Sequence, residues 1–500
     1  MGGSDSKPQG EKEELLFNVD ERERVQLIFC TISHGHKSFN KENFQHYVEP
    51  VLDHFTGSRL FEWIEGPLPG HKPHHDRRHH THHHHSQQST GNPIHLHHFA
   101  SHLAILFKKS NVSELSSVCL FLASTSSSSV SASDLVHFVG NTLHSYEKLL
   151  SAHCTAYQSW IFSVATDQMG HKHLASSLLN PLLKTVGKLT LGPNEDAENS
   201  STLCLSLDQV EEWLSHCHLF QNILQQVLKG ALQFYSTEPH QIVFHPRLPQ
   251  VRDTNWSKFR TILDFSAVLF LNAALPSDQQ TQWKLVYSNA LHGHSFGRFL
   301  MCITSADMPT VILIKDKTGR MFGGFAPIPW QTNPKFTGDY ACFLFQLGPT
   351  FNIYKTTGYN KNFMYLNAQQ QTLPNGLGMG GQFEYFGLWI DQSFDRGHSK
   401  AGERGCTTYG SPQLSEQQDF EIDSIEVWAV GRKKEGDEED DDDDFEASAK
   451  SGKAKSLLDK VEDADKALLD LVDRGTVSDH LRDEPLVQET KAHNTVISPF

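Results

Sequence analysis

The sequence predicts an α+β protein whose helices and strands occupy different halves of a 500-residue chain. Apolar residues recur at helical spacing up to about residue 240, whereas short β-rich runs bounded by turn residues follow. The length also exceeds what one hydrophobic core usually organises. We therefore expect an all-helical domain followed by a sandwich of largely antiparallel sheets.

The helical domain is expected over residues 15–240, after a flexible tail over residues 1–14. Its clearest pattern of apolar residues runs from Val210 to Leu228, and Asp208 and Glu211 before and within it have the spacing of a capping box. The sequence predicts a helix that Asp208 opens.

A histidine-rich stretch, residues 71–98, interrupts this domain, and 12 of its 28 residues are histidine. Pro, Gly, Gln and Ser separate the histidines, a composition that forms no core, so we predict a disordered insertion. Imidazoles in such a run bind transition metals adventitiously. No specific metal site and no cofactor are predicted.

The second domain is expected over residues 244–431. Ser277 and Gln280 predict a capped helix that extends to Leu285. Short β-rich runs follow, with a glycine-containing turn between the first two. These predicted strands are Val311–Ile314, Phe322–Ala326, Cys342–Leu347, Phe386–Ile390 and Ile425–Val430.

Charge and cysteine usage limit the possible functions. The formal net charge is -16, and the run of eight carboxylates from Asp437 to Asp444 accounts for half of it. Nucleic-acid binding is not expected, because no cluster of Lys and Arg is present. Eight scattered cysteines without a Cys-x-x-Cys pair indicate reduced thiols in the cytosol. The longest apolar stretch falls short of the roughly 20 residues that a membrane span needs.

The end of the chain is expected to contain an acidic linker (432–450), an amphipathic helix (451–475) and a flexible tail (476–500). The helix has one apolar seam, which we predict binds a partner protein. A helix that packs back on its own second domain is the alternative. The seam residues are Leu457, Val461, Leu468 and Leu471.

The segment 244–431 resembles the TLDc domain, because a series of separated motifs occurs in order. They are Leu291-His-Gly-His-Ser-Phe296, Phe322-Gly-Gly-Phe325, Gly338-Asp-Tyr-Ala-Cys-Phe-Leu-Phe345, Thr357-Gly-Tyr-Asn360, Gly376-Leu-Gly-Met-Gly-Gly381, Phe386-Gly-Leu-Trp-Ile-Asp391 and Glu426-Val-Trp-Ala-Val-Gly431.

The resemblance implies a β-sandwich TLDc domain preceded by an EF-hand-like helical domain. It further implies a monomeric, non-catalytic adaptor on the cytosolic face of lysosomes that acts in mTOR growth and nutrient signalling and binds the V-ATPase. A soluble TLDc protein that protects against oxidative stress is the alternative. Calcium binding is not expected, because no EF-hand loop with its Gly at position six and Glu at position twelve is found before residue 240.

Gly2 and Ser6 fit the N-myristoylation pattern, and the resemblance supports Gly2 as a lipidation site. Acidic residues outnumber basic ones near this end, so no polybasic signal assists the lipid. One myristoyl chain binds membranes only marginally, with an association constant of roughly 10⁴ M⁻¹. Stable attachment to the lysosomal membrane therefore requires a second contact.

An enzymatic alternative would use a cysteine nucleophile with a histidine base and an orienting carboxylate. Its candidates are Cys406 or Cys342, His292, His294 or His398, and Asp339 or Asp391. Packing is the competing interpretation for Cys342, which lies within an apolar run. Gly376, Gly378 and Gly381 match a dinucleotide fingerprint, but a β-like run rather than a helix follows them, so nucleotide binding is not predicted.

Overall fold

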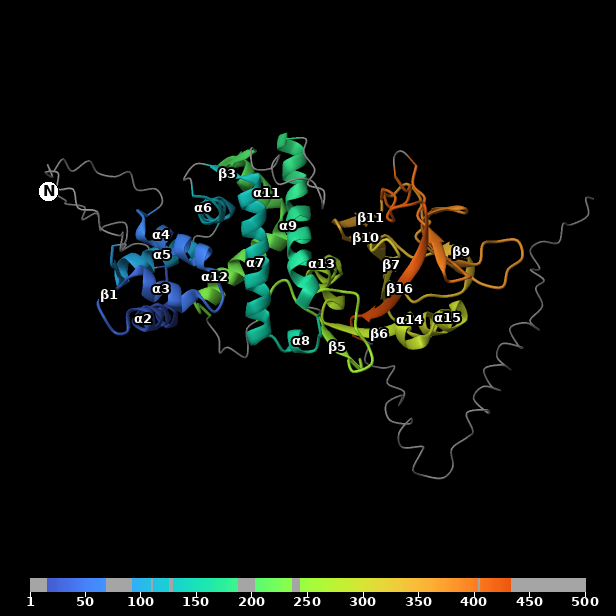
Figure 1. Cartoon of the computed structure of the whole chain (residues 1–500), viewed down its shortest axis with the longest axis horizontal. Coiled ribbons are helices and arrows are strands. Elements are labelled where there is room, and N and C mark those ends of the chain that lie inside the picture. Colours follow the sequence, from blue (N-terminus) through green and yellow to red (C-terminus); the bar gives the residue numbers. More distant parts are fainter. Residues whose placement is uncertain are drawn as a thin grey trace, which may run out of the picture. The chain divides into compact units, whose positions relative to one another are not determined.

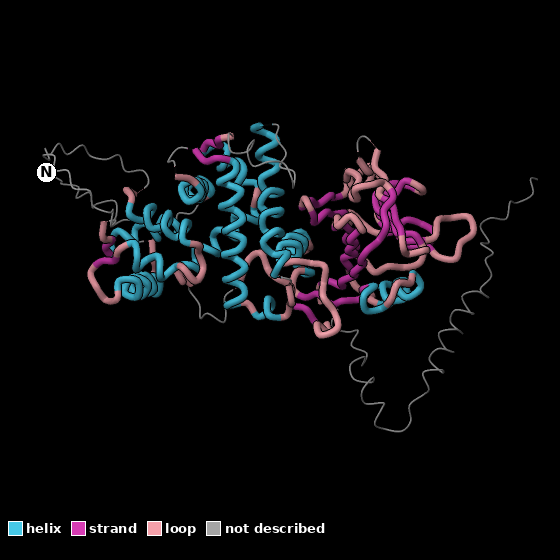
Figure 2. The backbone as a smooth tube through the Cα atoms, in the orientation of Figure 1, coloured by secondary structure: helices cyan, strands magenta, loops and turns pink. Residues whose placement is uncertain are grey.

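A computed structural model describes residues 16–68, 92–108, 111–125, 129–162, 164–187, 203–235, 243–402 and 405–432. Helices predominate in the first half, and the strands of the large sheet all lie in the second (Figure 2), so the predicted α+β class is confirmed. None of the described helices is both long and apolar enough to cross a membrane.

Two helix–loop–helix units form the beginning of the described chain. The helices are α2 (Val19–Ser33), α3 (Lys41–Val48), α4 (His54–Glu65) and α5 (Leu96–Lys108). The loop strands β1 (Ser38–Phe39) and β2 (Ile94–His95) pair antiparallel, which joins the two units in the manner of a pair of EF-hands.

The position of β2 corrects one boundary from the sequence. Residues 71–98 were expected to be a disordered insertion, but Ile94 and His95 form this strand and Leu96 begins α5. The histidine content hid the buried apolar side chain of Ile94, which belongs to the helical core. The rest of the histidine-rich stretch up to residue 91 lies outside the described residues.

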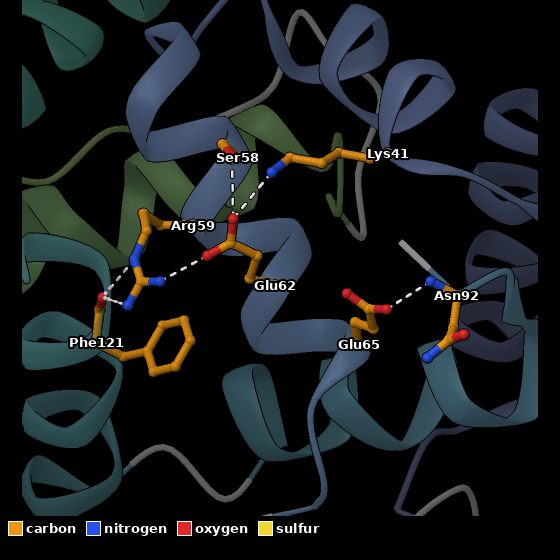
Figure 3. A network of polar contacts seen from close by, with 7 residues as sticks. All are labelled: Lys41, Ser58, Arg59, Glu62, Glu65, Asn92 and Phe121. Atoms are coloured by element: carbon orange, nitrogen blue, oxygen red, sulfur yellow. Dashed lines mark hydrogen bonds and ion pairs between the residues drawn. The ribbon is translucent and has the colours of Figure 1, made fainter. Parts of the chain in front are cut away.

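A polar network around Glu62 ties α4 to its neighbours (Figure 3). Glu62 Oε1 accepts from Lys41 Nζ at 2.9 Å, and Glu62 Oε2 accepts from Arg59 at 2.6 Å. Arg59 also donates to the Phe121 carbonyl, at 3.2 and 2.9 Å, and so reaches the next helix group. Burial raises the pKa of Glu62, but the bonds from Lys41 and Arg59 outweigh it and lower the pKa overall.

The second helix group contains α6 (Val112–Ala123), α7 (Ala132–His153), α8 (Thr155–Gln158), α9 (Val164–Gly187), α11 (Leu207–His216) and α12 (His218–Ala231). Its strands β3 (Ser129–Ser131) and β4 (Cys204–Ser206) pair as β1 and β2 do. The predicted single helix from Val210 to Leu228 is wrong in detail. Ser206 with Gln209 forms the capping box, and the helix breaks at Cys217.

The second half begins with β5 (Gln250–Arg252), α13 (Phe265–Ala274) and the short 3₁₀ helix η2 (Ser277–Gln279). The predicted helix through Leu285 is wrong, because β6 (Gln282–Ser288) occupies these positions and pairs with β5 and β16. Two short helices follow, α14 (Asn289–His292) and α15 (Phe296–Ser305).

The remaining strands form a largely antiparallel sheet that folds into two layers, and the five predicted strands are confirmed within it. They are β7 (Thr310–Asp316), β8 (Met321–Ala326), β9 (Asn333–Thr337), β10 (Phe343–Gly348), β11 (Phe351–Lys355), β12 (Met364–Asn367), β13 (Gly376–Gln382), β14 (Tyr385–Asp391), β15 (Arg396–His398) and β16 (Asp419–Val430).

The long strand β16 belongs to both layers. Its first residues pair with β15, and its later residues pair with β7 and β6. Apolar side chains from both layers fill one core, which includes Ile312, Leu344, Leu377 and Leu388. At Gly324 a Cβ atom would lie 2.3 Å from Met379 Sδ in the opposite layer, so the two sheets face each other closely.

The other face of the β7–β8–β10 layer packs against the helical half. Trp160, which follows α8, lies 5.4 Å from Trp428 and 5.9 Å from Trp283 between ring centroids, and its Nε1 donates to the Pro249 carbonyl at 2.7 Å. On α9, Ser177 Oγ accepts from the backbone N–H of Phe351 at 2.9 Å. α7 and α9 run beside each other and lead to this junction (Figure 1).

Candidate functional site

The two candidate nucleophiles are packing residues of the β-sandwich core. Cys406 is buried, and a Cβ atom on Gly387 would lie 2.8 Å from its Sγ. Cys342 is also buried, and burial raises the pKa of its thiol to about 12. A thiol with this pKa carries almost no thiolate at neutral pH, so Cys342 is a poor nucleophile.

The three candidate histidine bases lie in different surroundings. His292 Nδ1 accepts from the Ser288 N–H at 3.0 Å, and the His294 ring lies 5.2 Å from Phe394. His398 stacks on Trp389 with centroids 6.0 Å apart, and burial lowers its pKa to about 4. Each ring therefore has a structural contact that explains its position.

The candidate carboxylates order local turns. Asp339 accepts from the Ala341 N–H, and Asp391 accepts from the Ser393 N–H, each at 2.8 Å. Both bonds have the short sequence separation of an Asx-turn. The geometry thus gives all seven candidates of the enzymatic alternative individual structural roles.

The glycine-rich segment forms strand β13 rather than a phosphate-binding loop. A Cβ atom on Gly378 would lie 2.6 Å from the ring of Phe386, on the neighbouring strand β14. The glycines therefore make room for an aromatic cluster on the outer face of this layer, which comprises Phe336, Tyr365, Phe386 and Trp389.

A polar cavity of about 830 Å³ lies in the β-sheet half. It lies where the β7–β8 turn, β15 and the start of β16 meet. Four carboxylates and two basic side chains line it, so its formal charge is negative. These are Asp316, Asp395, Asp419 and Glu421 with Lys317 and Arg396.

Asp316 is the buried member of this lining. Its Oδ1 accepts from the Thr318 N–H, the Thr318 hydroxyl and the Arg320 N–H at 3.0, 2.6 and 2.9 Å, which fixes the predicted turn. Its Oδ2 is buried and accepts no hydrogen bond. Because Oδ2 is inaccessible, a cationic group such as a basic side chain of another protein would meet the exposed carboxylates of the lining, Asp395, Asp419 and Glu421.

The exposed rim is held by local ion pairs. Lys317 pairs with Glu421, and this hydrogen bond raises the pKa of the Lys317 ammonium. The Ser393 hydroxyl lowers the pKa of Asp395, whose Oδ1 also lies 3.5 Å from Arg396 Nε. Exposed pairs of this kind rearrange at small cost, so a partner can compete for them.

The structure also gathers three potential metal ligands that the sequence did not reveal. His144 and Glu147 come from α7, and His171 comes from α9. The His-x-x-Glu spacing on a helix is the only sequence signal for this group, because His171 is distant in sequence.

The predicted lipidation site and partner-binding residues lie outside the described residues. These are Gly2, Leu457, Val461, Leu468 and Leu471.

The TLDc family model matches residues 256–431. The chain is 34% identical over 399 residues to the MTOR-associated protein MEAK7 of Gallus gallus, an alignment that covers 78% of this chain and 80% of that protein. It is 36% identical over 384 residues to the Homo sapiens protein of the same name, which covers 75% and 78% of the two chains.

A second kind of relative matches a shorter region. The chain is 35% identical over 147 residues to Oxidation resistance protein 1 of Rattus norvegicus, which covers 29% of this chain and 16% of that protein.

Proposed function

The chain belongs to the TLDc family, and we propose that it is a non-catalytic adaptor in mTOR signalling. One observation carries this proposal. The alignments to the Gallus gallus and Homo sapiens proteins named MTOR-associated are more than twice as long as the TLDc segment, so the similarity includes the helical half. The match to Oxidation resistance protein 1 is shorter than the TLDc segment and supports the oxidative-stress alternative less well.

The absence of enzymatic activity is part of the proposal. Its support is that Cys342 and Cys406 fill the sandwich core, while His398 stacks within the aromatic cluster. A nucleophile needs an adjacent base and an accessible position. The polar cavity, with its exposed carboxylates Asp395, Asp419 and Glu421, suits recognition of a basic side chain better than bond cleavage.

Membrane attachment and partner choice extend the proposal. A myristoyl group on Gly2 would bring the adaptor to the cytosolic face of lysosomes, where its marginal affinity requires a protein contact as well. We infer that the seam of Leu457, Val461, Leu468 and Leu471 supplies this contact, with the V-ATPase as its partner. Linking two weak contacts raises the overall affinity through effective concentration.

One cellular experiment tests the adaptor against the enzyme. Wild type, Gly2→Ala and Cys406→Ser chains are expressed in cells that lack the endogenous protein, and lysosomal sedimentation, mTOR co-precipitation and kinase output are measured. We expect Gly2→Ala to lose sedimentation and Cys406→Ser to behave as wild type. Gly3→Ala is the matched control for the tail, because it leaves the acceptor glycine intact.

Two results would contradict the proposal. If the Cys406→Ser protein folds and sediments normally but no longer supports kinase output, the result favours the enzymatic alternative over the adaptor. If Gly2→Ala still sediments as wild type does, the lipid is not the anchor.

A further inference from the structure

The contact between α7 and α9 brings together three side chains that metals commonly bind. His144 and Glu147 are three residues apart on α7, so they share one face of that helix. Glu147 Oε2 lies 3.3 Å from His171 Nε2, which α9 supplies, and 3.9 Å from His144 Nδ1. All three ligand atoms lie within 4.8 Å of one another.

The separations between these ligand atoms are close to those between the ligands of a bound zinc ion. Zinc binds nitrogen and oxygen ligands at 2.0–2.2 Å with tetrahedral angles, which separates the ligand atoms by about 3.4 Å. The Glu147–His171 pair already has this separation. Only His144 must approach, and its side chain is about half exposed and can turn.

The side chains around Glu147 and His171 hold these two buried residues in an arrangement that suits a bound cation. His171 is 4% exposed, and its Nε2 faces Glu147 without making a hydrogen bond. The Tyr157 hydroxyl donates to Glu147 Oε1 at 2.9 Å, an outer contact of the type that orients metal-binding carboxylates. Burial lowers the pKa of His171 to about 4 and also lowers the pKa of His144.

We propose that His144, Glu147 and His171 form a divalent transition-metal site of the zinc type, in which water completes the coordination on the exposed side of His144. The ligand set of two histidines and one glutamate is one that zinc uses when it keeps an open position. The ion would link α7 to α9 beside the junction with the sheet. Gly170, next to His171, packs against Asp264, which caps α13.

A purely structural cluster is the competing interpretation. In that case the three side chains would be held without an ion by the Tyr157–Glu147 hydrogen bond and by the ring contacts of His171 with His144 and Phe265. This interpretation does not explain why the buried Nε2 of His171 faces the Glu147 carboxylate without forming a hydrogen bond. Buried polar atoms in native proteins are normally satisfied.

Cobalt titration distinguishes the two interpretations. The full chain is used with His79, His80 and His82 to His85 replaced by Ser, which removes the adventitious run from every sample. We expect one equivalent of Co²⁺ to give the intense visible absorption of tetrahedral coordination, and one equivalent of Zn²⁺ to displace it. Zn²⁺ should also raise the melting temperature, because it binds only the folded state.

Variants then assign the site. His144→Ala removes a half-exposed ligand without opening the core, and Glu147→Gln keeps the shape and the Tyr157 contact; each should weaken Co²⁺ binding by more than about 100-fold. His137→Ala is the matched control, because this exposed histidine lies on the same helix. Absence of tetrahedral absorption in the parent, or an unchanged titration in folded His144→Ala, would overturn the proposal.

Discussion

Glu426 is a fully buried carboxyl group beneath the aromatic junction between the two halves. It accepts from the Thr261 hydroxyl and the Ile262 N–H at 2.7 Å each, and from Trp428 Nε1 at 2.9 Å. Burial nevertheless dominates and raises its pKa to about 7. A single side chain therefore makes the free energy of unfolding sensitive to pH in a physiological range.

The sign of this effect follows from linkage. Because the pKa of folded Glu426 is above its ordinary value of 4.5, its stabilising contribution is complete below pH 4.5 and is lost as the pH rises through 7. The difference amounts to about 3 kcal/mol at most. Glu426→Gln should cost about 1–3 kcal/mol at pH 5, since the amide accepts fewer of the three bonds, and much less at pH 8.

Urea denaturation of wild type and Glu426→Gln at pH 5, 6, 7 and 8 measures the difference in the free energy of unfolding between the two proteins. Other titrating groups cancel in the difference between the two proteins. Glu416→Gln, an exposed residue of the same type, should leave the difference flat. If the difference in the free energy of unfolding between wild type and Glu426→Gln stays constant across the four pH values, the Glu426 carboxyl does not titrate in this range.

Residue-scale inference from the sequence succeeded where a local pattern fixes the structure. The turn from Asp316 to Gly319 forms as predicted, because Gly319 adopts φ +90° and Asp316 accepts backbone bonds within the turn. The metal-ligand group escaped detection because His144 and His171 meet only when α7 packs on α9. No spacing rule encodes that contact.

At the scale of elements, short β-rich runs were the most reliable signal. The five predicted strands all exist, because their apolar runs are buried on both faces of the sheet. Helix starts were less well defined. Ser206 with Gln209 and Asp208 with Glu211 both have capping-box spacing, and the pairing of β4 with β3 favours the first.

The segment after Ser277 shows how tertiary pairing overrides a local cap signal. Its residues beyond Gln280 read as a helix, yet Gln282–Ser288 forms β6 because β16 and β5 offer backbone partners on both sides. Trp283 and Tyr287 become fully buried in this strand. Such long-range pairing cannot be deduced from the segment alone.

The β7–β8 hairpin leads to a prediction at this scale. A Cβ atom on Gly323 would lie 1.9 Å from the Ile312 carbonyl oxygen, a backbone atom that cannot move without breaking the pairing of the two strands. We expect Gly323→Ala to destabilise the protein by about 3 kcal/mol. Thermal or urea unfolding of the purified chain measures the loss.

Gly402→Ala is the matched control, because this exposed glycine has open space around its Cβ position. It should change stability by less than about 0.5 kcal/mol. Equal stability of Gly323→Ala and wild type would mean that β7 and β8 do not pair as closely as described.

At the scale of the whole molecule, the helical half and the sheet half share one hydrophobic core. Leu149 from α7, Leu179 from α9 and Trp160 lie in the same cluster as Val311, Phe343 and Trp428 from the sheet. A ligand that stiffens α7 and α9 would therefore act on the base of the sheet as well. The proposed metal site lies beside this junction, because the His171 ring contacts Phe265 of α13.

The chain after residue 432 carries the last prediction, that the seam of Leu457, Val461, Leu468 and Leu471 docks on a partner protein. The preceding acidic linker repels itself and should extend away from the folded part. Burial of four aliphatic side chains offers roughly 6–10 kcal/mol before ordering costs. The free energy that is left after the ordering costs is enough for a reversible contact, which a single lipid would supplement.

Replacing Leu468 and Leu471 with Glu separates docking from packing on the same chain. A docking helix should lose co-precipitation of the V-ATPase while the melting temperature of the purified protein stays unchanged, because the seam is then exposed in isolation. Lys455→Gln with Lys466→Gln changes the net charge by the same amount on the helix face opposite the seam and should retain binding. A lower melting temperature with partner binding intact would instead identify the helix as an internal strut, since only a seam buried against its own chain contributes to folding stability.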